Sequence, residues 1–331
     1  MTQNTSPTPY EHLTPDVMLE AVSQLDLNPD GRMLALNSYE NRVYQFYTNG
    51  NERIVVKFYR PERWTQAQIE EEHAFAQELS FAEIPVVAPL VLQGKTLHQH
   101  QGFMYAVYPC VGGRMPELET QTTLEWVGRF LGRIHIIGET HTFKHRPALD
   151  IASFGWASVD YLLEKSVLPP DLESIWHQCC QQVLTLSQQI WDDIKDIQLI
   201  SLHGDCHPGN ILWREPDNND PGGPYFVDLD DARTGPAVQD LWMLVSGTHE
   251  ERKLQLSILL SSYEDFFEFD WREIKLIEVL RTLRMIHYSA WLARRWNDPA
   301  FPPAFPWFGT HSYWQEQVQG LQTQLNLLQQ M

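Results

Sequence analysis

The sequence predicts an α+β protein with two lobes, a small antiparallel β-sheet lobe followed by a larger, mainly helical lobe. The chain of 331 residues is long for one compact core. Short apolar and aromatic runs separated by turn residues fill its first third, whereas helical periodicity dominates the remainder. Hydrophobic residues make up 43% and charged residues 20%, which is typical of a globular chain. Together these observations favour two lobes over a single-layered domain.

The first third begins with a polar segment that we expect to be flexible, residues 1–13. Thr14 and Pro15 then mark a helix start, with threonine as the cap and proline in the first turn. The Asn-Gly-Asn sequence at 49–51 is typical of a hairpin turn between two strands. We expect helices over 14–25 and 65–80, strands over 33–36, 43–48, 54–59, 87–93 and 103–108, and a histidine-rich turn around 98–100.

Composition changes after residue 108, where we place a hinge over residues 109–115. The β-rich lobe is therefore expected to span 14–108 and the helical lobe 116–331. Leu124, Val127, Leu131 and Ile134 recur at helical spacing. Further helices are expected over 156–165, 171–196, 238–247, 252–268, 273–296 and 312–328, interrupted by a loop-rich stretch over 199–224 and a strand over 225–229.

The charge balance excludes several classes of partner. With 24 Lys and Arg residues against 43 Asp and Glu residues, the formal net charge is −19. Nucleic acid and anionic lipid both require a basic surface, so we expect neither nucleic-acid nor membrane binding. The sequence has no signal peptide, no run of 18 apolar residues and no C-x-x-C pair. We therefore expect a cytoplasmic protein and, since no interface helix stands out, a monomer.

Two short segments carry residues suited to group transfer. The first is 203–210, with the sequence HGDCHPGN, and the second is 226–231, with the sequence FVDLDD. Phosphoryl transfer from ATP needs a carboxylate near the attacking hydroxyl and hard oxygen ligands for Mg²⁺. Asp205 is the candidate for the catalytic carboxylate, and Asn210 and Asp228 are the candidate metal ligands. The two segments predict ATP and Mg²⁺ as the cofactors.

The same chemistry needs a cation on the phosphates, and the best candidate is Lys57 at the end of an expected strand. A strand lysine in this role is oriented by a glutamate of the following helix. That helix carries three consecutive glutamates at 70–72. We favour Glu72 as the partner of Lys57 because of its spacing from Leu79, with Glu71 as the alternative.

The pattern H-G-D-x-H-P-x-N followed by an aromatic-Val-Asp-x-Asp strand resembles the aminoglycoside phosphotransferase and choline kinase superfamily, which has a protein-kinase-like fold. A closer resemblance is to the bacterial stress response kinase A family. It rests on LNSYENRVY at 36–44, on Ala-Arg at 232–233 and on PAFP at 299–302, and it extends over about 14–314. The resemblance implies an ATP-dependent serine/threonine protein kinase that also phosphorylates itself.

By this resemblance, Asp205 corresponds to the catalytic base, Asn210 and Asp228 to the Mg²⁺ ligands, and Lys57 to the phosphate-binding lysine. Asp240 resembles the aspartate that braces the catalytic loop. The remaining assignments are the loop brace His203, the hinge residues Cys110 and Val111 beside the adenine, and Asn37 and Ser38 in the nucleotide-covering loop.

The sequence departs from ordinary protein kinases in two ways. The covering loop lacks G-x-G-x-x-G, so side chains of Asn37, Ser38 and Asn41 are the candidates for phosphate contacts. Only twelve residues lead from Asp228 to Asp240, which leaves no room for a long activation loop. This short segment favours a small hydroxyl acceptor, such as an amino alcohol or an aminoglycoside, and the acidic surface favours cationic acceptors. A nucleotide-binding pseudokinase is the third hypothesis, although the complete residue set argues against it.

Several assignments stay open at this level. Asp230 either reaches a second metal, or is solvated, or supports the metal ligands from behind. Ser38 is a candidate for autophosphorylation, but its hydroxyl could equally serve only as a hydrogen-bonding group. The aromatic side chains of Tyr288, Trp291, Trp296 and Trp307 belong mainly to the helical core, with one or two of them candidates for the acceptor side of the cleft.

Overall fold

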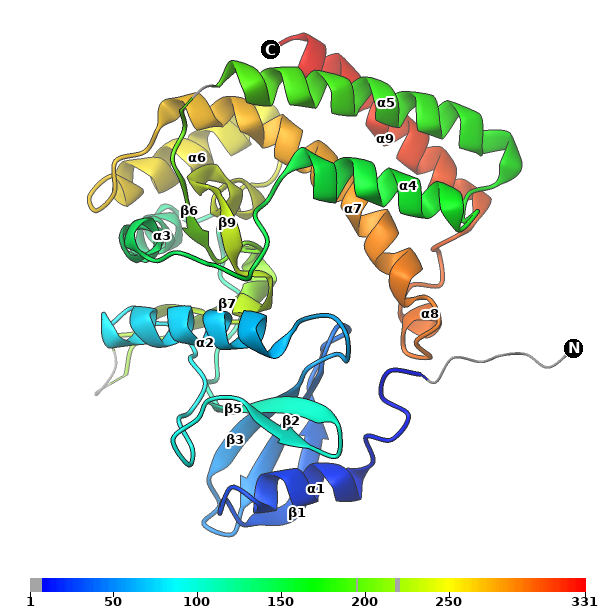
Figure 1. Ribbon diagram of the computed structural model, residues 1–331. Helices are drawn as coiled ribbons and strands as arrows, with labels where there is room; N and C mark the ends of the chain where they lie inside the picture. The colour runs from blue at the N-terminus through cyan, green and yellow to red at the C-terminus, as the bar shows by residue number, and fades with distance from the viewer. Residues whose placement is uncertain (1–7, 195, 218–220) are drawn as a thin grey trace, which may run out of the picture.

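A computed structural model describes residues 8–194, 196–217 and 221–331. Figure 1 shows two lobes, a β-sheet lobe formed by the first third of the chain and a helical lobe formed by the rest. The predicted α+β class with a small antiparallel sheet is therefore confirmed. No helix among the described residues is long and apolar enough to cross a membrane.

The sheet of the first lobe has five antiparallel strands in the order β1-β2-β3-β5-β4. The predicted hairpin at Asn49 to Asn51 joins β2 to β3, and its turn is closed by a hydrogen bond from Asn51 N to Thr48 O of 2.8 Å. The strands are β1 (Pro29–Ala35), β2 (Arg42–Thr48), β3 (Arg53–Phe58), β4 (His98–His100) and β5 (Phe103–Pro109).

Helices cover both faces of this sheet, and strand alternation decides what faces which helix. Helix α1 (Pro15–Ser23) packs on the face that carries Val56 and Phe58, in one buried cluster. Lys57 lies between these two residues in sequence and so points to the opposite face. Helix α2 (Gln66–Phe81) lies on that side, and its first turn is held by a capping box at Thr65. The sheet thus directs the Lys57 side chain towards the second lobe.

One predicted strand and one predicted turn of this lobe were wrong. Residues 87–93 form no strand in the structure, since Leu90 N makes a hydrogen bond to Val107 O but Pro89 has no N–H to continue a ladder. His98–His100, expected to be a turn, form β4 instead and pair with β5. The turn lies at Gln101 and Gly102, both with positive φ, which is typical of a tight hairpin.

Helices of the second lobe surround a large apolar core. Trp176 and Trp314 are fully buried at its centre, and their ring centroids are 5.8 Å apart. Burial of a large apolar side chain contributes about 1.5–3 kcal/mol, so such residues hold the long helices together. The helices are α3 (Gln121–Thr140), α4 (Ala157–Glu164), α5 (Pro170–Asp193), α6 (His249–Tyr263), α7 (Ile277–Arg295), α8 (Phe301–Ala304) and α9 (His311–Gln329), with π-helix η1 (Ala152–Trp156) before α4 and 3-10 helix η6 (Trp271–Leu276) before α7.

The predicted helix over 238–247 was also wrong. The segment forms two 3-10 turns, η4 (Ala237–Asp240) and η5 (Trp242–Leu244). Tertiary hydrogen bonds replace helical ones here, because Val238 N donates to Glu273 Oε2 at 2.8 Å and the Asp240 carboxylate accepts from a neighbouring loop. Apolar periodicity alone could not reveal these contacts.

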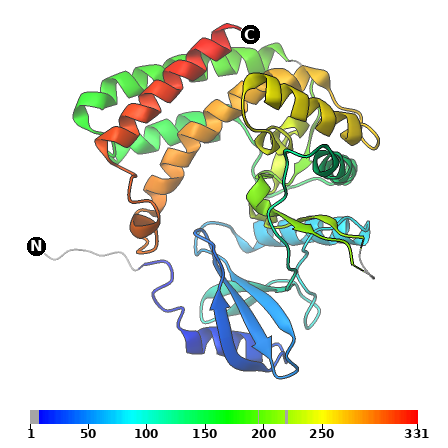
Figure 2. The same cartoon turned by 180° about the vertical axis from the view of Figure 1, so that it is seen from behind.

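Two short antiparallel strand pairs are set into the helical lobe, and they hold the motif-bearing loops. Strand β6 (Leu199–Leu202) pairs with β9 (Arg233–Pro236), and β7 (Ile211–Arg214) pairs with β8 (Gly223–Phe226). The pair β7 and β8 lies between α3 and the first lobe, as Figure 2 shows from behind, whereas β6 packs beside α3. An isolated bridge joins Val86 to Phe226, so β8 is also linked to the segment that follows α2.

The lobe boundaries stay predictions. Strand β5 ends at Pro109 and α3 begins at Gln121, and we propose that the hinge lies in the first part of this connection. The predicted flexible tail falls partly on residues 1–7, which lie outside the described residues. Within residues 8–13, the Tyr10 hydroxyl donates to Glu40 O at 3.1 Å.

Gly138 makes the close approach of α3 to β6 possible, which gives a stability prediction. A Cβ at Gly138 would lie 2.1 Å from Ser201 O, a backbone atom that cannot yield easily. We expect Gly138→Ala to destabilise the fold by about 1–3 kcal/mol. Urea unfolding measures this, with Gly112→Ala as the control because a Cβ there meets no atom within 4 Å. Equal unfolding midpoints for the two variants would contradict the close packing.

Candidate active site

The candidate site is a cleft between the lobes with a volume of about 1010 Å³. Residues of both lobes line it, and they include most of those predicted from the sequence. Val111 lines the cavity, whereas Cys110 does not, since its thiol lies 3.4 Å from Gln45 Oε1. The predicted site residues in the lining are Asn37, Ser38, Lys57, Glu72, Val111, Asp205, Asn210, Asp228 and Asp230.

Lys57 is the centre of charge on the sheet side of the cleft. Its Nζ lies 2.9 Å from Asp228 Oδ1 and 3.1 Å from Asp230 Oδ1, and its side chain is only 7% exposed. Burial alone would lower the pKa of Lys57, but the carboxylates of Asp228, Asp230 and Glu72 raise it well above its usual value. Lys57 therefore stays a cation.

The predicted ion pair between Lys57 and Glu72 does not form among the described residues. Glu72 is buried beside the site, as expected from its helix position, but Lys57 pairs with the aspartates and makes no ion pair with Glu72 among the described residues. The closest cation to Glu72 is Arg146, at 3.9 Å from Oε2. Glu71, the alternative, points elsewhere and accepts backbone N–H groups from residues 144–146 at 2.7–2.9 Å.

Asp240 holds the loop that carries Asp205. Its two carboxylate oxygens accept the backbone N–H groups of His203 and Gly204, each at 2.8 Å. The His203 ring lies 2.9 Å from Val227 O, which ties the loop to the residue before Asp228. Gly204 has φ +84° and a Cβ there would lie 2.1 Å from Asp231 O, so only glycine fits.

Asp205 and Asn210 are joined within the same loop. Asn210 Nδ2 donates to Asp205 O at 3.0 Å, which leaves the Asn210 Oδ1 atom as the oxygen available to a metal. The Asp205 carboxylate is held from outside the loop, because Arg284 Nη1 of α7 donates to its Oδ1 at 2.6 Å. His207 Nε2 lies 3.6 Å from the other oxygen.

Asp228 follows β8 in a left-handed conformation, with φ 61° and ψ 62°. A non-glycine residue in this region costs about 1 kcal/mol or more, and such residues concentrate at functional sites. The side chain of Asp228 is 51% exposed, far more than the neighbouring Asp230 at 5%. Asp228 is thus the carboxylate of this segment that opens into the cleft.

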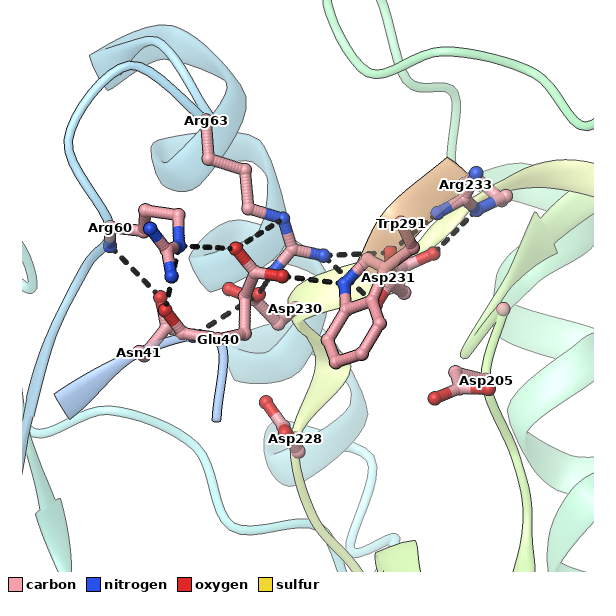
Figure 3. Close-up of polar contacts among 12 residues, drawn as sticks. Glu40, Asn41, Arg60, Arg63, Asp205, Asp228, Asp230, Asp231, Arg233 and Trp291 are labelled. Atoms are coloured by element: carbon pink, nitrogen blue, oxygen red, sulfur yellow. Dashed lines mark hydrogen bonds and ion pairs between the residues drawn. The ribbon is translucent and has the colours of Figure 1, made fainter. Parts of the chain in front are cut away.

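Asp230 and Asp231 lie behind Asp228 in a cluster of buried charges (Figure 3). Arg63 pairs with both aspartates, and Arg233 pairs with Asp231 at 2.6 Å. Burial would raise the pKa of Asp230, but Arg63 and Lys57 lower it to about 2. Both Asp230 oxygens therefore face cations or donors of this chain, which favours support from behind over ligation of a second metal.

The covering loop between β1 and β2 is fastened to the helical lobe. Glu40 Oε2 accepts from Trp291 Nε1 at 2.7 Å and pairs with Arg295 Nε at 2.5 Å, both on α7. Asn41, expected to contact phosphate, is buried instead, with its Oδ1 accepting from Arg60 N and its Nδ2 donating to Asp230 Oδ2. That expectation was wrong, because its polar atoms are used within the protein.

Comparison with known proteins identifies the family. A model of the phosphotransferase enzyme family matches residues 33–277. Stress response kinase A of Escherichia coli (strain K12) is 45% identical over 327 residues, which cover 99% of this chain and 97% of that protein. The chain belongs to the phosphotransferase enzyme family. Serine/threonine protein kinase RdoA of Salmonella typhimurium (strain LT2) is also 45% identical, over 93% of this chain and 92% of that protein. This phosphotransferase is thus a full-length homologue of stress response kinase A.

Solved structures of other kinases share the fold of this phosphotransferase. An aminopropanol kinase associated with microcompartments aligns with a TM-score of 0.69 at 15% identity, covering 96% of this chain and 97% of that one. Amicoumacin kinase hAmiN, in complex with AMP-PNP, Ca²⁺ and Ami, aligns with a TM-score of 0.68 at 16% identity, covering 92% of each chain. At these identities the likeness concerns the fold.

Sequence reasoning missed the arginines of the phosphotransferase site. Arg233 stands directly after the FVDLDDA segment and could have been found from that position. Arg63, Arg146 and Arg284 lie 167, 84 and 79 positions from the aspartates they contact. The local sequence does not predict such pairs, because only tertiary packing brings the two residues together.

The position of Glu72 gives a pH prediction. Burial raises its pKa from 4.5 to about 7, although Lys57 acts to lower it. Because the folded protein then binds this proton more tightly than the unfolded chain, the stability it provides is complete below about pH 4.5 and is lost as the pH rises through 7. We expect the free energy of unfolding of Glu72→Gln, relative to that of the wild type, to rise by about 1–3 kcal/mol when the pH is raised from 5 to 8.

Urea unfolding at the two pH values measures this difference. Glu70→Gln on the same helix is the matched control, because Glu70 is exposed and its carboxylate accepts from Gln66 at 2.8 Å. A difference between Glu72→Gln and wild type that does not change with pH would show that Glu72 stays ionised in the folded protein.

Proposed function

We propose that this phosphotransferase is a serine/threonine protein kinase that moves the γ-phosphoryl group of ATP to a protein hydroxyl, its own included. The observation that carries the proposal is the convergence of Lys57, Asp205, Asn210 and Asp228 on one cleft between the lobes. These are the groups that phosphoryl transfer requires. The protein character of the acceptor rests on the 45% identity to the kinase named serine/threonine protein kinase RdoA.

Asp205 is the proposed catalytic residue. Its carboxylate would accept a hydrogen bond from the acceptor hydroxyl and orient the oxygen towards the γ-phosphorus. As the new oxygen–phosphorus bond forms, the bond from that phosphorus to the β–γ bridging oxygen breaks, ADP leaves, and the hydroxyl proton passes to Asp205. Asp240 and His203 hold the loop in place through the contacts described above, so the carboxylate is positioned before the acceptor binds.

Lys57 is the proposed phosphate-binding cation, and Asn210 and Asp228 are the proposed Mg²⁺ ligands. Among the described residues, no group of three or more His, Cys, Asp or Glu side chains forms a metal site. Two hard oxygen donors nevertheless fit Mg²⁺, which commonly takes one or two protein ligands and completes its shell with water and phosphate oxygens. Bound there, Mg²⁺ would supply positive charge that neutralises the charge developing on the phosphates during transfer.

The nucleotide is proposed to lie between the sheet and the inner surface of the second lobe. Apolar residues of both lobes line this end of the cavity, including Val55, Leu212 and Val111. Val111 belongs to the proposed hinge, and its backbone is our candidate for contact with the adenine. The loop with Asn37 and Ser38 lines the same cavity and is held over it by Glu40.

A small-molecule kinase is the second candidate. The twelve residues that end at Asp240 are occupied by η3 (Leu229–Asp231), β9 and η4, so there is no long activation loop in this segment. An aminopropanol kinase, which is named for a small-molecule acceptor, shares the fold of this chain. A pseudokinase is the third, and it conflicts with the complete set of site residues.

The role of Asp205 gives the first test. We expect Asp205→Ala to lower phosphoryl transfer at least about 100-fold while leaving ATP binding intact, because a general base contributes factors of this size. Transfer from labelled ATP and nucleotide binding are measured on the same preparations. Asp160→Ala, an exposed position on α4 outside the cavity, is the control. Normal transfer by Asp205→Ala would exclude Asp205 as the catalytic residue.

The acceptor gives the second test. After incubation of the purified chain with Mg²⁺ and ATP, we expect phosphate on serine or threonine side chains, including Ser38, when the sites are mapped by mass spectrometry. Ser38→Ala removes one site, while Ser80→Ala on α2 is the matched control. Phosphate on other serines alone would reject Ser38 but keep the kinase. Transfer only to small alcohols would support the second candidate, and no transfer the third.

A further inference from the structure

The helical side of the cleft is formed largely by one face of α7. Figure 1 shows α7 running from the helical lobe towards α8, and residues of α7 line the cavity between the lobes. The charged residues that α7 contributes to the cavity lining are all arginines, and no carboxylate of this helix reaches it. We call this surface the α7 wall, and its members are Arg284, His287, Tyr288, Trp291, Arg294 and Arg295.

The first arginine of the α7 wall, Arg284, forms an ion pair with the proposed catalytic residue Asp205. Arg284 Nη1 donates to Asp205 Oδ1 at 2.6 Å, yet the Arg284 side chain is 44% exposed. An ion pair this exposed contributes only about 0–1 kcal/mol. Another anion can therefore replace Asp205 on this guanidinium at little cost. The replacement would leave Asp205 open to the acceptor hydroxyl.

The other two arginines differ in their partners. Arg295 is held by Glu40 of the covering loop. Arg294 is exposed, its guanidinium carbon lies 4.9 Å from the Tyr161 ring centroid, and it forms no ion pair with any described residue. Arg284 and Arg294 are therefore the members of the α7 wall that could receive an anion from outside.

The spacing of these two arginines suits an extended chain. Ten residues of helix separate them, which corresponds to a rise of about 15 Å, the length of four to five residues of extended peptide. Between them lie Tyr288 and Trp291, stacked with ring centroids 5.6 Å apart and planes within 12°. A wall of this length with aromatic surface between two cations fits a peptide better than a small metabolite.

The carboxylates elsewhere in the cavity do not compete for these arginines. Asp228 and Asp230 face Lys57, and Asp231 faces Arg63 and Arg233. Glu40 faces Arg60 and Arg295. The net charge of −19 predicted a cationic acceptor, but the acceptor side of the cleft is locally cationic. Local charge at the contact surface, and not the total, determines which flanking groups are accepted.

We infer that the α7 wall selects serine or threonine acceptors flanked by acidic side chains, with Arg284 exchanging Asp205 for a substrate carboxylate and Arg294 binding a second one. A guanidinium suits this role because it binds a carboxylate through two parallel hydrogen bonds. The inference rests on the proposed protein kinase function and adds the class of acceptor sequence. It makes Arg284 and Arg294 specificity residues of this phosphotransferase.

Three peptides test the inference on the full chain, identical except that the residues around a single serine are acidic, neutral or basic. With Mg²⁺ and labelled ATP, we expect kcat/KM for the acidic peptide to exceed that for the neutral one about tenfold. Arg284→Gln and Arg294→Gln should each reduce this ratio severalfold, in line with one exposed charge pair apiece. Arg53→Gln, an exposed arginine of β3 outside the cavity, should keep the ratio. A preference for the basic peptide, or a ratio unaffected by both cavity variants, would overturn the inference.

A binding measurement separates failure of the inference from failure of the proposed function. Fluorescent versions of the acidic and neutral peptides carry alanine in place of the serine, so that no transfer is required. Tighter binding of the acidic peptide, lost in the double variant Arg284→Gln with Arg294→Gln, would support the α7 wall even if no peptide were phosphorylated. Absence of transfer both to every peptide and to the chain itself would overturn the protein kinase proposal. Equal binding of both peptides would overturn the inference.

Discussion

Asp230 is a buried carboxylate on which both lobes depend. It lies on the helical lobe and receives Lys57, Arg63 and Asn41 from the sheet lobe. A buried charge is strongly destabilising without partners, so removal of one partner costs more than the pair itself contributes. The same aspartate thus fixes the strand that carries Lys57, the segment before α2 and the end of the covering loop. These charge pairs join the lobes at the site, in addition to the apolar cluster in which Phe75 and Leu79 of α2 pack with residues of the helical lobe.

The same arrangement determines which charged side chains are available to ligands. Four cations of this chain face four acidic side chains along the sheet side of the cleft; they are Lys57, Arg63, Arg146 and Arg233 beside Glu72, Asp228, Asp230 and Asp231. Asp228 is the most exposed of these carboxylates and opens into the cleft. On the opposite side, the carboxylate of Asp205 contacts, among the described residues, an exposed arginine at 2.6 Å and a histidine at 3.6 Å. Asp230 is thus buried and fully paired, whereas the Asp228 side chain is half exposed and can meet a ligand.

Much of the fold could be predicted from local sequence, because caps, the Asn-Gly turn and helical periodicity are local signals. The errors arose where distant partners decide the backbone. Residues 238–247 are apolar at helical spacing, yet Asp240 binds the loop at His203 and Gly204 and the segment becomes two short turns. At the site, the motifs indicated Lys57 and Asp228 as candidates. The direct ion pair between these two residues, and the pairing of Glu72 with Arg146 in place of Lys57, depend on three-dimensional packing.

The central claim is that the cleft beside Asp230 is a Mg²⁺-dependent nucleotide site in which Asp228 is a metal ligand. Titration calorimetry of the full chain with a non-hydrolysable ATP analogue, with and without Mg²⁺, tests it most directly. We expect Mg²⁺ to tighten binding in the wild type and to have no effect in Asp228→Ala, while Asp160→Ala behaves as the wild type. A Mg²⁺ effect of equal size in wild type and Asp228→Ala would exclude Asp228 as a metal ligand.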